Sequence, residues 1–215
     1  MNNYDAILKL FLEVAQNSKS NDMANNNEEV PIGVSNRHIH LCEKDLNVLF
    51  GDEYKLFKIK DLSQPGQYAC NETLTICGPK GAIEKVRILG PLRHKTQVEV
   101  LLGDCFKLGI SPKARLSGEL NNTPGITLIG PKGSVQISEG TIVAQRHIHM
   151  SFKDAEKFGV HDGQVVSIEF NNIRGGVYNN VIVRATEKSV LECHIDIEEA
   201  NAMCINSKSK VRIIK

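Results

Sequence analysis

The sequence predicts a mainly β protein with short helices, folded as two related lobes that are each a small β-barrel. This expectation rests on three observations: short strand-like segments recur along the chain, a ten-residue block occurs twice, and the helical patterns are brief. With 215 residues the chain can build one large domain or two small ones. Two small lobes fit both the length and the repeat.

The first segment is expected to lie apart from these lobes. Residues 4–16 place apolar side chains at helical spacing, which predicts an N-terminal amphipathic helix. The Asn-rich stretch that follows has almost nothing to bury, so residues 1–29 are predicted to be a helix and a flexible linker. Such a helix can dock on its own body, on a twin subunit or on another protein.

Strand signals fill the rest of the chain. They are short runs rich in β-branched or alternating apolar residues, at 73–76, 86–89, 97–102, 126–129, 165–170, 180–185, 190–195 and 211–214. The sequence Gly-Pro-Lys-Gly at 78–81 and again at 130–133 predicts hairpin turns. Ser151 and Asp154 match a capping box, which predicts a helix that ends near Gly159.

The internal repeat is the most informative feature. RHIHLCEKDL at 37–46 matches RHIHMSFKDA at 146–155, and each copy leads from a short apolar strand into a short helix. The two copies therefore indicate two related lobes. Because the segment 112–124 is poor in core residues, we expect a first β-barrel domain over 30–115 and a second over 116–215.

The composition is that of an ordinary globular protein, with 41% hydrophobic and 24% charged residues. The net charge of +1 and the lack of Trp argue against a nucleic-acid-binding protein. No apolar run reaches the roughly 18 residues that span a bilayer, and no signal peptide is recognisable. We therefore expect a cytoplasmic protein without a membrane partner. The six cysteines have no Cys-x-x-Cys spacing and are interpreted as buried thiols.

The repeated histidines are the strongest sign of chemistry. Side chains two positions apart on a strand point the same way, so His38 projects with His40, and His147 with His149. Two imidazoles so placed can bind one cation at about 2.0–2.1 Å. One His-x-His is a weak signal, but two copies in a matched repeat favour metal binding. The alternative is that both pairs are ordinary surface or core histidines.

A catalytic zinc site usually has three protein ligands, so each pair needs one more. Glu99, held on a strand, is a candidate, with an exposed strand glutamate as the alternative. His194 lies on the polar face of its strand and is the best candidate for a three-histidine site, with a hydrogen-bonded strand histidine as the alternative. His94 and His161 are weaker candidates because charged and turn residues flank them.

Arg93 is the candidate for binding an anion. It lies six residues before Glu99 and follows a Gly-Pro turn. A planar guanidinium binds phosphate in bidentate fashion, so an arginine beside a metal suits an anionic substrate. Arg87 and Lys80, upstream in the same segment, can extend a cationic surface. The alternative is three ordinary surface cations.

The chain closely resembles the PduL-type phosphotransacylases, also called phosphate propanoyltransferases, from about Val30 to the C-terminus. The resemblance rests on six blocks in order and at similar spacing: VPIGVSNRHIHL, QPGQYACNETLTICGPKG, VRILGPLRHKTQVEV, RLSGELNNTPG, RHIHM and HIDIEEANA. Two departures are mild. Cys42 stands where a helix-capping Ser or Thr is usual, and Leu101 stands where a polar residue is common.

The resemblance implies two β-barrel domains with the active site at their interface, a homodimer, and two zinc ions per chain. Carried over by motif, the ligands of one zinc would be His38, His40 and Glu99. Those of the other would be His147, His149 and His194. Arg93 would bind the phosphate. Contacts with coenzyme A (CoA) would fall on Val34, Ser35, Asn36, Lys80, Arg87 and Asn201.

The reaction implied by the resemblance is the reversible conversion of a short-chain acyl-CoA, propanoyl-CoA or acetyl-CoA, and phosphate into acyl phosphate and CoA. Some members of the family carry an N-terminal helix that loads them into bacterial microcompartments. Residues 4–16 and the linker resemble such a tag, so microcompartment shell or core proteins are expected partners.

Two other classes remain as alternatives. A cupin-like metal-dependent oxygenase or isomerase also combines His-x-His with a glutamate that closely follows the second histidine. Glu43 follows His40 in this way, but Phe152 holds the matching place after His149, which argues against that class. The second alternative is a non-catalytic metal-binding or scaffold protein, which should have no open coordination site and should not bind CoA.

Overall fold

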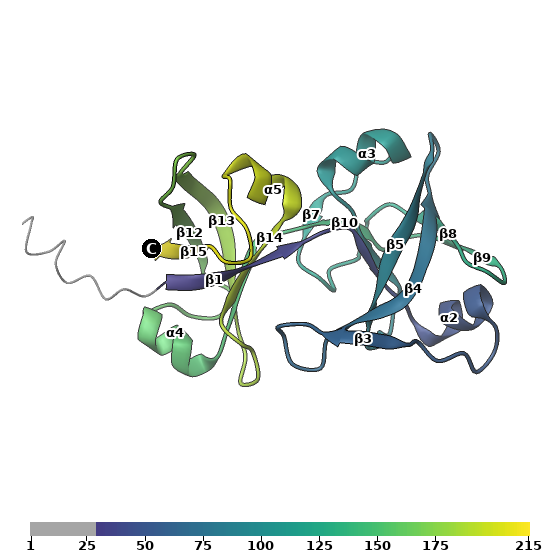
Figure 1. Ribbon diagram of the computed structural model, residues 1–215, viewed down its shortest axis with the longest axis horizontal. Helices are drawn as coiled ribbons and strands as arrows, with labels where there is room; N and C mark the ends of the chain where they lie inside the picture. The colour runs from purple at the N-terminus through teal and green to yellow at the C-terminus, as the bar shows by residue number, and fades with distance from the viewer. Residues whose placement is uncertain (1–28) are drawn as a thin grey trace, which may run out of the picture.

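The computed structural model describes residues 29–215. They form two lobes of β-strands with short helices at their margins (Figure 1). The predicted amphipathic helix at 4–16 lies outside the described residues. None of the described helices is long and apolar enough to cross a membrane.

One lobe is a closed six-stranded barrel, here called the barrel. Its strands, in the order in which they pair, are β1 (Glu29–Ser35), β14 (Glu192–Asp196), β11 (His147–Met150), β13 (Gly176–Ala185), β12 (Val165–Phe170) and β15 (Lys210–Ile214). The first and last strands of the described chain, β1 and β15, lie side by side in it (Figure 1).

The other lobe is a curled nine-stranded sheet, here called the curled sheet. Its strands, in pairing order, are β7 (Ala114–Arg115), β10 (Thr141–Ala144), β6 (Gln97–Glu99), β2 (His38–His40), β5 (Ala82–Gly90), β4 (Tyr68–Cys77), β8 (Ile126–Ile129) and β9 (Ser134–Ile137). A further strand, β3 (Lys58–Asp61), pairs with β4. The predicted mainly β fold is thus confirmed, with one lobe closed and the other open.

The predicted elements agree closely with the structure. Each predicted strand segment overlaps an observed strand, and both Gly-Pro-Lys-Gly sequences join antiparallel strands. The segment 97–102 is a shorter strand than expected, because a helix begins at Leu102. The four described helices are α2 (Glu43–Phe50), α3 (Leu102–Leu108), α4 (Phe152–Phe158) and α5 (Ile197–Ala202).

Strand pairing divides the chain differently from the expected boundary between 115 and 116. β1 pairs with β14 and β15 and so belongs to the barrel, whereas β8, β9 and β10 belong to the curled sheet. The physical reason is burial: Val30 and Ile32 of β1 are 0% and 2% exposed within the core of the barrel. The segment 112–124, poor in core residues, joins parts of the curled sheet instead of separating the lobes.

The middle residue of each His-x-His anchors its strand in a separate core. Ile39 packs in the core of the curled sheet and Ile148 in that of the barrel, and both are 0% exposed. Burying one such side chain contributes about 1.5–3 kcal/mol. Because neighbouring side chains on a strand alternate, this burial turns the flanking histidines to the opposite face of each sheet.

The helix after each His-x-His strand begins in a different way. At α4, the Ser151 side chain accepts a hydrogen bond from the Asp154 N–H, which confirms the predicted capping box. At α2, the Cys42 side chain makes no cap. Here the Thr96 hydroxyl accepts from the Cys42 N–H at 3.0 Å and donates to Asp45 Oδ2 at 2.6 Å. Thr96, which directly precedes β6, thus donates to the Asp45 carboxylate as the Ser151 hydroxyl donates to Asp154 Oδ2 at 2.6 Å.

We therefore expect Thr96→Val to destabilise the protein by about 1–3 kcal/mol, because it leaves a buried carboxylate and a backbone N–H without this partner. Urea unfolding measures the change. Thr75→Val is the control, since the half-buried Thr75 hydroxyl on β4 makes no hydrogen bond within residues 29–215. Equal stability of the two variants would contradict this role for Thr96.

Candidate active site

The same three-stranded unit occurs in both lobes. β2 pairs parallel with β5 and antiparallel with β6, and β11 pairs parallel with β13 and antiparallel with β14. The antiparallel register sets His38 opposite Glu99, and His147 opposite His194. Directly opposed residues have Cβ atoms about 4.5–5.5 Å apart. Each third candidate ligand is therefore held beside its histidine pair by strand pairing.

The two resulting trios have the spacing of metal ligands. In each, one nitrogen or oxygen atom per residue lies within 4.8 Å of the others. His38 Nε2 is 3.4 Å from Glu99 Oε1, and His147 Nε2 is 3.2 Å from His149 Nε2. Two ligands at about 2.0–2.1 Å from one tetrahedral ion lie about 3.3 Å apart. These residues therefore fit a divalent metal ion.

The first histidine of each pair is oriented in the same way. The Nδ1–H of His38 donates to the Asn36 carbonyl at 2.8 Å, and that of His147 donates to the Gln145 carbonyl at 2.8 Å. When Nδ1 donates its hydrogen to a carbonyl, Nε2 is the nitrogen that the ring can offer to a metal. This holds for both histidines, and on His38 a metal ion would replace the proton that pairs with Glu99.

Burial keeps most of these imidazoles neutral. It lowers the pKa of His40 to about 3, with further contributions from the positive charges of His38 and Arg93. It also lowers the pKa of His147 to about 4 and that of His149 to about 3, aided by the neighbouring histidines. A neutral imidazole is the form that binds a metal, so no proton has to leave these rings at neutral pH.

His38 and Glu99 behave as a buried ion pair. Burial by itself opposes the charge on both groups, but their attraction outweighs it. The pKa of His38 is therefore raised, and that of Glu99 lies well below its usual range. Glu99 is an ionised carboxylate that can hold a cation.

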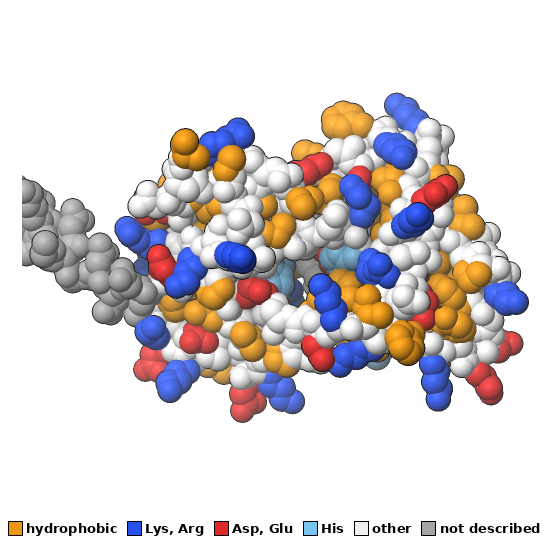
Figure 2. Space-filling model, in the orientation of Figure 1, with side chains coloured by type: hydrophobic (Ala, Val, Ile, Leu, Met, Phe, Trp, Pro, Cys, Tyr) orange, Lys and Arg blue, Asp and Glu red, His pale blue; other side chains and the backbone are white. Residues whose placement is uncertain are grey.

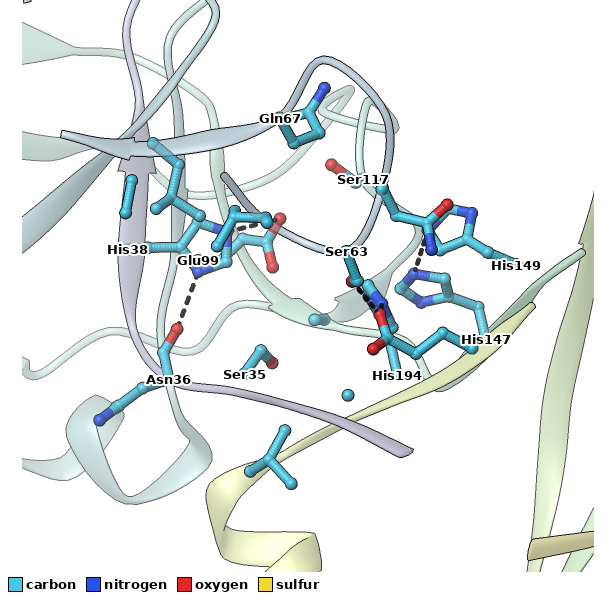
Figure 3. Close-up of a pocket in the computed structure, with 18 of the residues that line it drawn as sticks. Ser35, Asn36, His38, Ser63, Gln67, Glu99, Ser117, His147, His149 and His194 are labelled. Atoms are coloured by element: carbon cyan, nitrogen blue, oxygen red, sulfur yellow. Dashed lines mark hydrogen bonds and ion pairs between the residues drawn. The ribbon is translucent and has the colours of Figure 1, made fainter. Parts of the chain in front are cut away.

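Both trios face one cavity of about 1160 Å³. Figure 2 shows histidine side chains in a hollow between the two lobes, with Lys and Arg around it. In Figure 3, His38 and Glu99 lie on one side of this space and the three histidines of the barrel on the other. The lobes are close enough there for the negative charge of Glu99 to oppose slightly the lowering of the His147 pKa that burial causes. The structure thus brings all six predicted ligands to the same cavity.

Arg93 reaches this cavity from the curled sheet. One of its terminal nitrogens lies 2.8 Å from His40 Nε2, and the other donates to the Ser117 hydroxyl at 2.8 Å. Ser117 also accepts from the Gln97 amide, which in turn donates to Glu99 at 2.6 Å. The predicted anion-binding arginine is therefore joined to the predicted metal ligands by a chain of hydrogen bonds.

The structure places some of the residues expected to contact CoA at the cavity and others away from it. Those that line the cavity are Val34, Ser35, Asn36 and Arg87. Lys80 lies instead beside a smaller cavity of about 340 Å³ next to α3. Asn201 is exposed on α5 and is not part of the cavity lining.

Comparison with known proteins identifies the family. The family model for phosphate propanoyltransferase matches residues 31–206. The chain is 53% identical to the phosphate propanoyltransferase of Rhodopseudomonas palustris (strain BisB18) over 187 residues, 87% of this chain and 83% of that protein. It belongs to the phosphate propanoyltransferase family.

Two further relatives bear the same name. The phosphate propanoyltransferase of Thermotoga maritima is 50% identical over 185 residues, 86% of this chain and 88% of its own length. That of Priestia megaterium is 49% identical over 205 residues, 95% of this chain and 94% of its own length. The similarity therefore covers both lobes and both ligand trios.

The cupin-like alternative has no support in these findings. Glu43, the glutamate that such a site needs after His40, is exposed at the start of α2 and belongs to neither trio. Phe152, at the matching place after His149, is 60% exposed. The phosphate propanoyltransferase family and the site geometry agree with each other, and we do not retain that alternative.

Several residues at the site of this phosphate propanoyltransferase family member were not singled out from the sequence. Glu192 Oε2 lies 2.5 Å from His194 Nε2 and accepts a hydrogen bond from the Ser63 hydroxyl. Arg184 lines the cavity from β13. Two of these had a usable signal: Glu192 alternates with His194 on one strand, and Arg184 lies on a predicted strand. Ser63 lies on a loop, and no local pattern indicates its position.

We expect the purified protein to hold two divalent metal ions per chain. His149→Ala removes one ligand of three and should reduce the content to about one ion. His161→Ala is the control, because His161 is exposed and belongs to neither trio. Elemental analysis gives the stoichiometry. Two ions retained by His149→Ala would show that the three-histidine trio is not a metal site.

Proposed function

We propose that this protein is a phosphotransacylase that reversibly converts propanoyl-CoA and phosphate into propanoyl phosphate and CoA. Acetyl-CoA is a second substrate of the same class. The observation that supports the proposal most is the convergence of two metal-ligand trios and Arg93 on one cavity. Membership of the phosphate propanoyltransferase family agrees with it.

Zinc is the ion we propose for both trios. Its ligands in proteins are imidazole nitrogen, thiolate and carboxylate, and three protein ligands leave the fourth position open for substrate. When bound, zinc would supply Lewis acidity to the thioester carbonyl and to the departing thiolate.

The residues of the chain account for the positioning of phosphate. Arg93 offers a planar guanidinium to the anion, and Ser117 fixes one of its nitrogens at 2.8 Å. A phosphate oxygen then attacks the thioester carbonyl carbon, the carbon–sulfur bond breaks, and CoA leaves as thiolate. Phosphate is already ionised at neutral pH, so no general base is required. Much of the rate acceleration would come from proximity and fixed charge.

The CoA molecule is proposed to enter along the cavity wall formed by Val34, Ser35 and Asn36. Val34 and Ser35 end β1, and Asn36 begins the short link to β2, where its side chain accepts from the Arg37 N–H at 2.8 Å. Arg87 lines the same cavity, although its guanidinium also donates to the carbonyls of Cys70 and Asn71. Contacts at Lys80 and Asn201 stay predictions.

Arg93→Ala should lower the rate of phosphate-dependent thiol release from propanoyl-CoA by about 10–100-fold, the loss expected for one charged hydrogen-bonding partner. Lys95→Ala is the matched control, because this nearby cation is exposed and pairs with Glu139 at the surface. The assay is run with acetyl-CoA and propanoyl-CoA, each with and without phosphate. An Arg93→Ala rate within threefold of wild type would remove Arg93 from the chemistry.

A homodimer in the cytoplasm, loaded into a bacterial microcompartment through residues 4–16, is the assembly that we propose. Deletion of residues 1–28 should abolish encapsulation and leave activity unchanged, since every proposed ligand lies beyond residue 28. Co-purification with intact compartments measures the first effect and thiol release the second. Unchanged encapsulation of the truncated protein would rule out this role for the segment.

A further inference from the structure

Arg184 is a positively charged residue beside the three-histidine trio, and neither the proposed metal sites nor the proposed phosphate contact of Arg93 involves it. It lies on β13, where strand pairing sets it directly opposite His149. The side chain is half-buried and lines the same cavity as Arg93, which reaches it from the other lobe. The two guanidinium groups are near enough for the charge of Arg184 to add to the effect of burial in lowering the pKa of Arg93.

Arg184 differs from the other arginines of the cavity in having no partner. Arg37 pairs with Asp104 at 2.7 Å, Arg87 donates to two backbone carbonyls, and Arg93 donates to Ser117. Within the described part of the chain, the Arg184 guanidinium has no hydrogen-bond acceptor and no ion-pair partner. A half-buried guanidinium has five donors to satisfy and loses part of its hydration. The side chain is thus suited to an anion that is not part of the protein.

The repeat shows that this arginine is particular to one lobe. In the curled sheet, β5 holds the place of β13, and its Arg87 pairs with His38 as Ile182 of β13 pairs with His147. Two residues further along each strand, the curled sheet has Leu89 and the barrel has Arg184. Both line the cavity. One lobe therefore presents an apolar side chain where the other presents a positive charge.

Each lobe places a carboxylate at its trio: Glu99 belongs to the trio of the curled sheet, and Glu192 lies 2.5 Å from His194 in the barrel. Arg93 adds a positive charge on the side of the curled sheet, and Arg184 adds one on the side of the barrel. An anion bound between the two lobes can therefore be contacted by one arginine from each lobe. We propose that Arg184 is a second phosphate-positioning residue, which binds the attacking phosphate from the barrel while Arg93 binds it from the curled sheet.

The anion concerned is the reacting phosphate and not a phosphate group of CoA. Arg184 lies beside His149 at the ligand trios, which is where the acyl group must be when it reacts. The phosphates of CoA are separated from its sulfur by the long pantetheine arm, so they lie away from the reacting carbonyl. This inference rests on the proposed phosphotransacylase function.

The test varies phosphate and acyl-CoA separately in Arg184→Gln, Arg184→Lys and wild type. If Arg184 contacts phosphate both in the bound complex and in the transition state, its removal raises the KM for phosphate more than it lowers kcat. We expect Arg184→Gln to raise the KM for phosphate about tenfold or more, with the KM for propanoyl-CoA within twofold. Arg184→Lys keeps the positive charge but lacks the planar guanidinium, so its KM for phosphate should lie between those of wild type and Arg184→Gln.

Direct binding provides a readout independent of turnover. Calorimetric titration of the purified, metal-containing protein with inorganic phosphate should show weaker binding in Arg184→Gln by about the same factor. Arg174→Gln is the matched control, because it removes one exposed arginine from the same lobe outside the cavity. Metal content must equal that of wild type, which excludes disturbance of the neighbouring His149.

The outcomes separate the two proposals. If wild type shows no phosphate-dependent thiol release, the proposed function fails, and calorimetry still decides whether Arg184 binds phosphate. If wild type is active but Arg184→Gln leaves both the KM and the affinity for phosphate unchanged, the proposal that Arg184 positions phosphate is wrong. A rise confined to the KM for propanoyl-CoA also overturns it, since it would place a CoA phosphate at this arginine. Should Arg184→Gln fold poorly, Arg184→Lys gives the same decision.

Discussion

The site depends on one constraint, the register between each His-x-His strand and its antiparallel neighbour. This register sets His38 opposite Glu99 and His147 opposite His194. A slip of one residue would turn both histidines of a pair into the core and the intervening isoleucine out of it. Because Ile39 and Ile148 are completely buried, such a slip costs the burial of a large side chain. The hydrophobic cores therefore maintain the geometry of both ligand trios.

The arginine that opens each repeated motif reinforces this arrangement. Arg37 pairs with Asp104, and Arg146 pairs with Glu199. These acids are the third residues of α3 and α5, the short helices that follow the strands carrying Glu99 and His194, and each also accepts a backbone N–H at the start of its helix. The motif thus ties its own strand to the segment that follows the third candidate ligand. The repeat is a structural unit and not only a source of candidate metal ligands.

Much of this could be predicted from the sequence because the information is local. Strand alternation located β4, β5, β12 and β13, and the repeat located both histidine pairs. The membership of β1 could not be predicted, because it pairs in parallel with β14 from the far end of the chain. The role of Ser117 depends on a loop meeting Arg93, and the position of Arg184 depends on the pairing of β13 with β11. Such contacts follow from tertiary packing: alternation places Arg184 on a strand but does not show which strand lies beside it.

The central claim, that two trios of side chains from different lobes each hold a metal ion at one cavity, is tested most directly by anomalous X-ray scattering. Data collected from crystals of the purified protein above and below the zinc absorption edge locate any zinc ion. We predict two peaks per chain, one at about 2.0–2.2 Å from ligand atoms of His38, His40 and Glu99 and one equally close to His147, His149 and His194. Absence of both peaks, or peaks at cysteine sulfurs instead, would contradict this account.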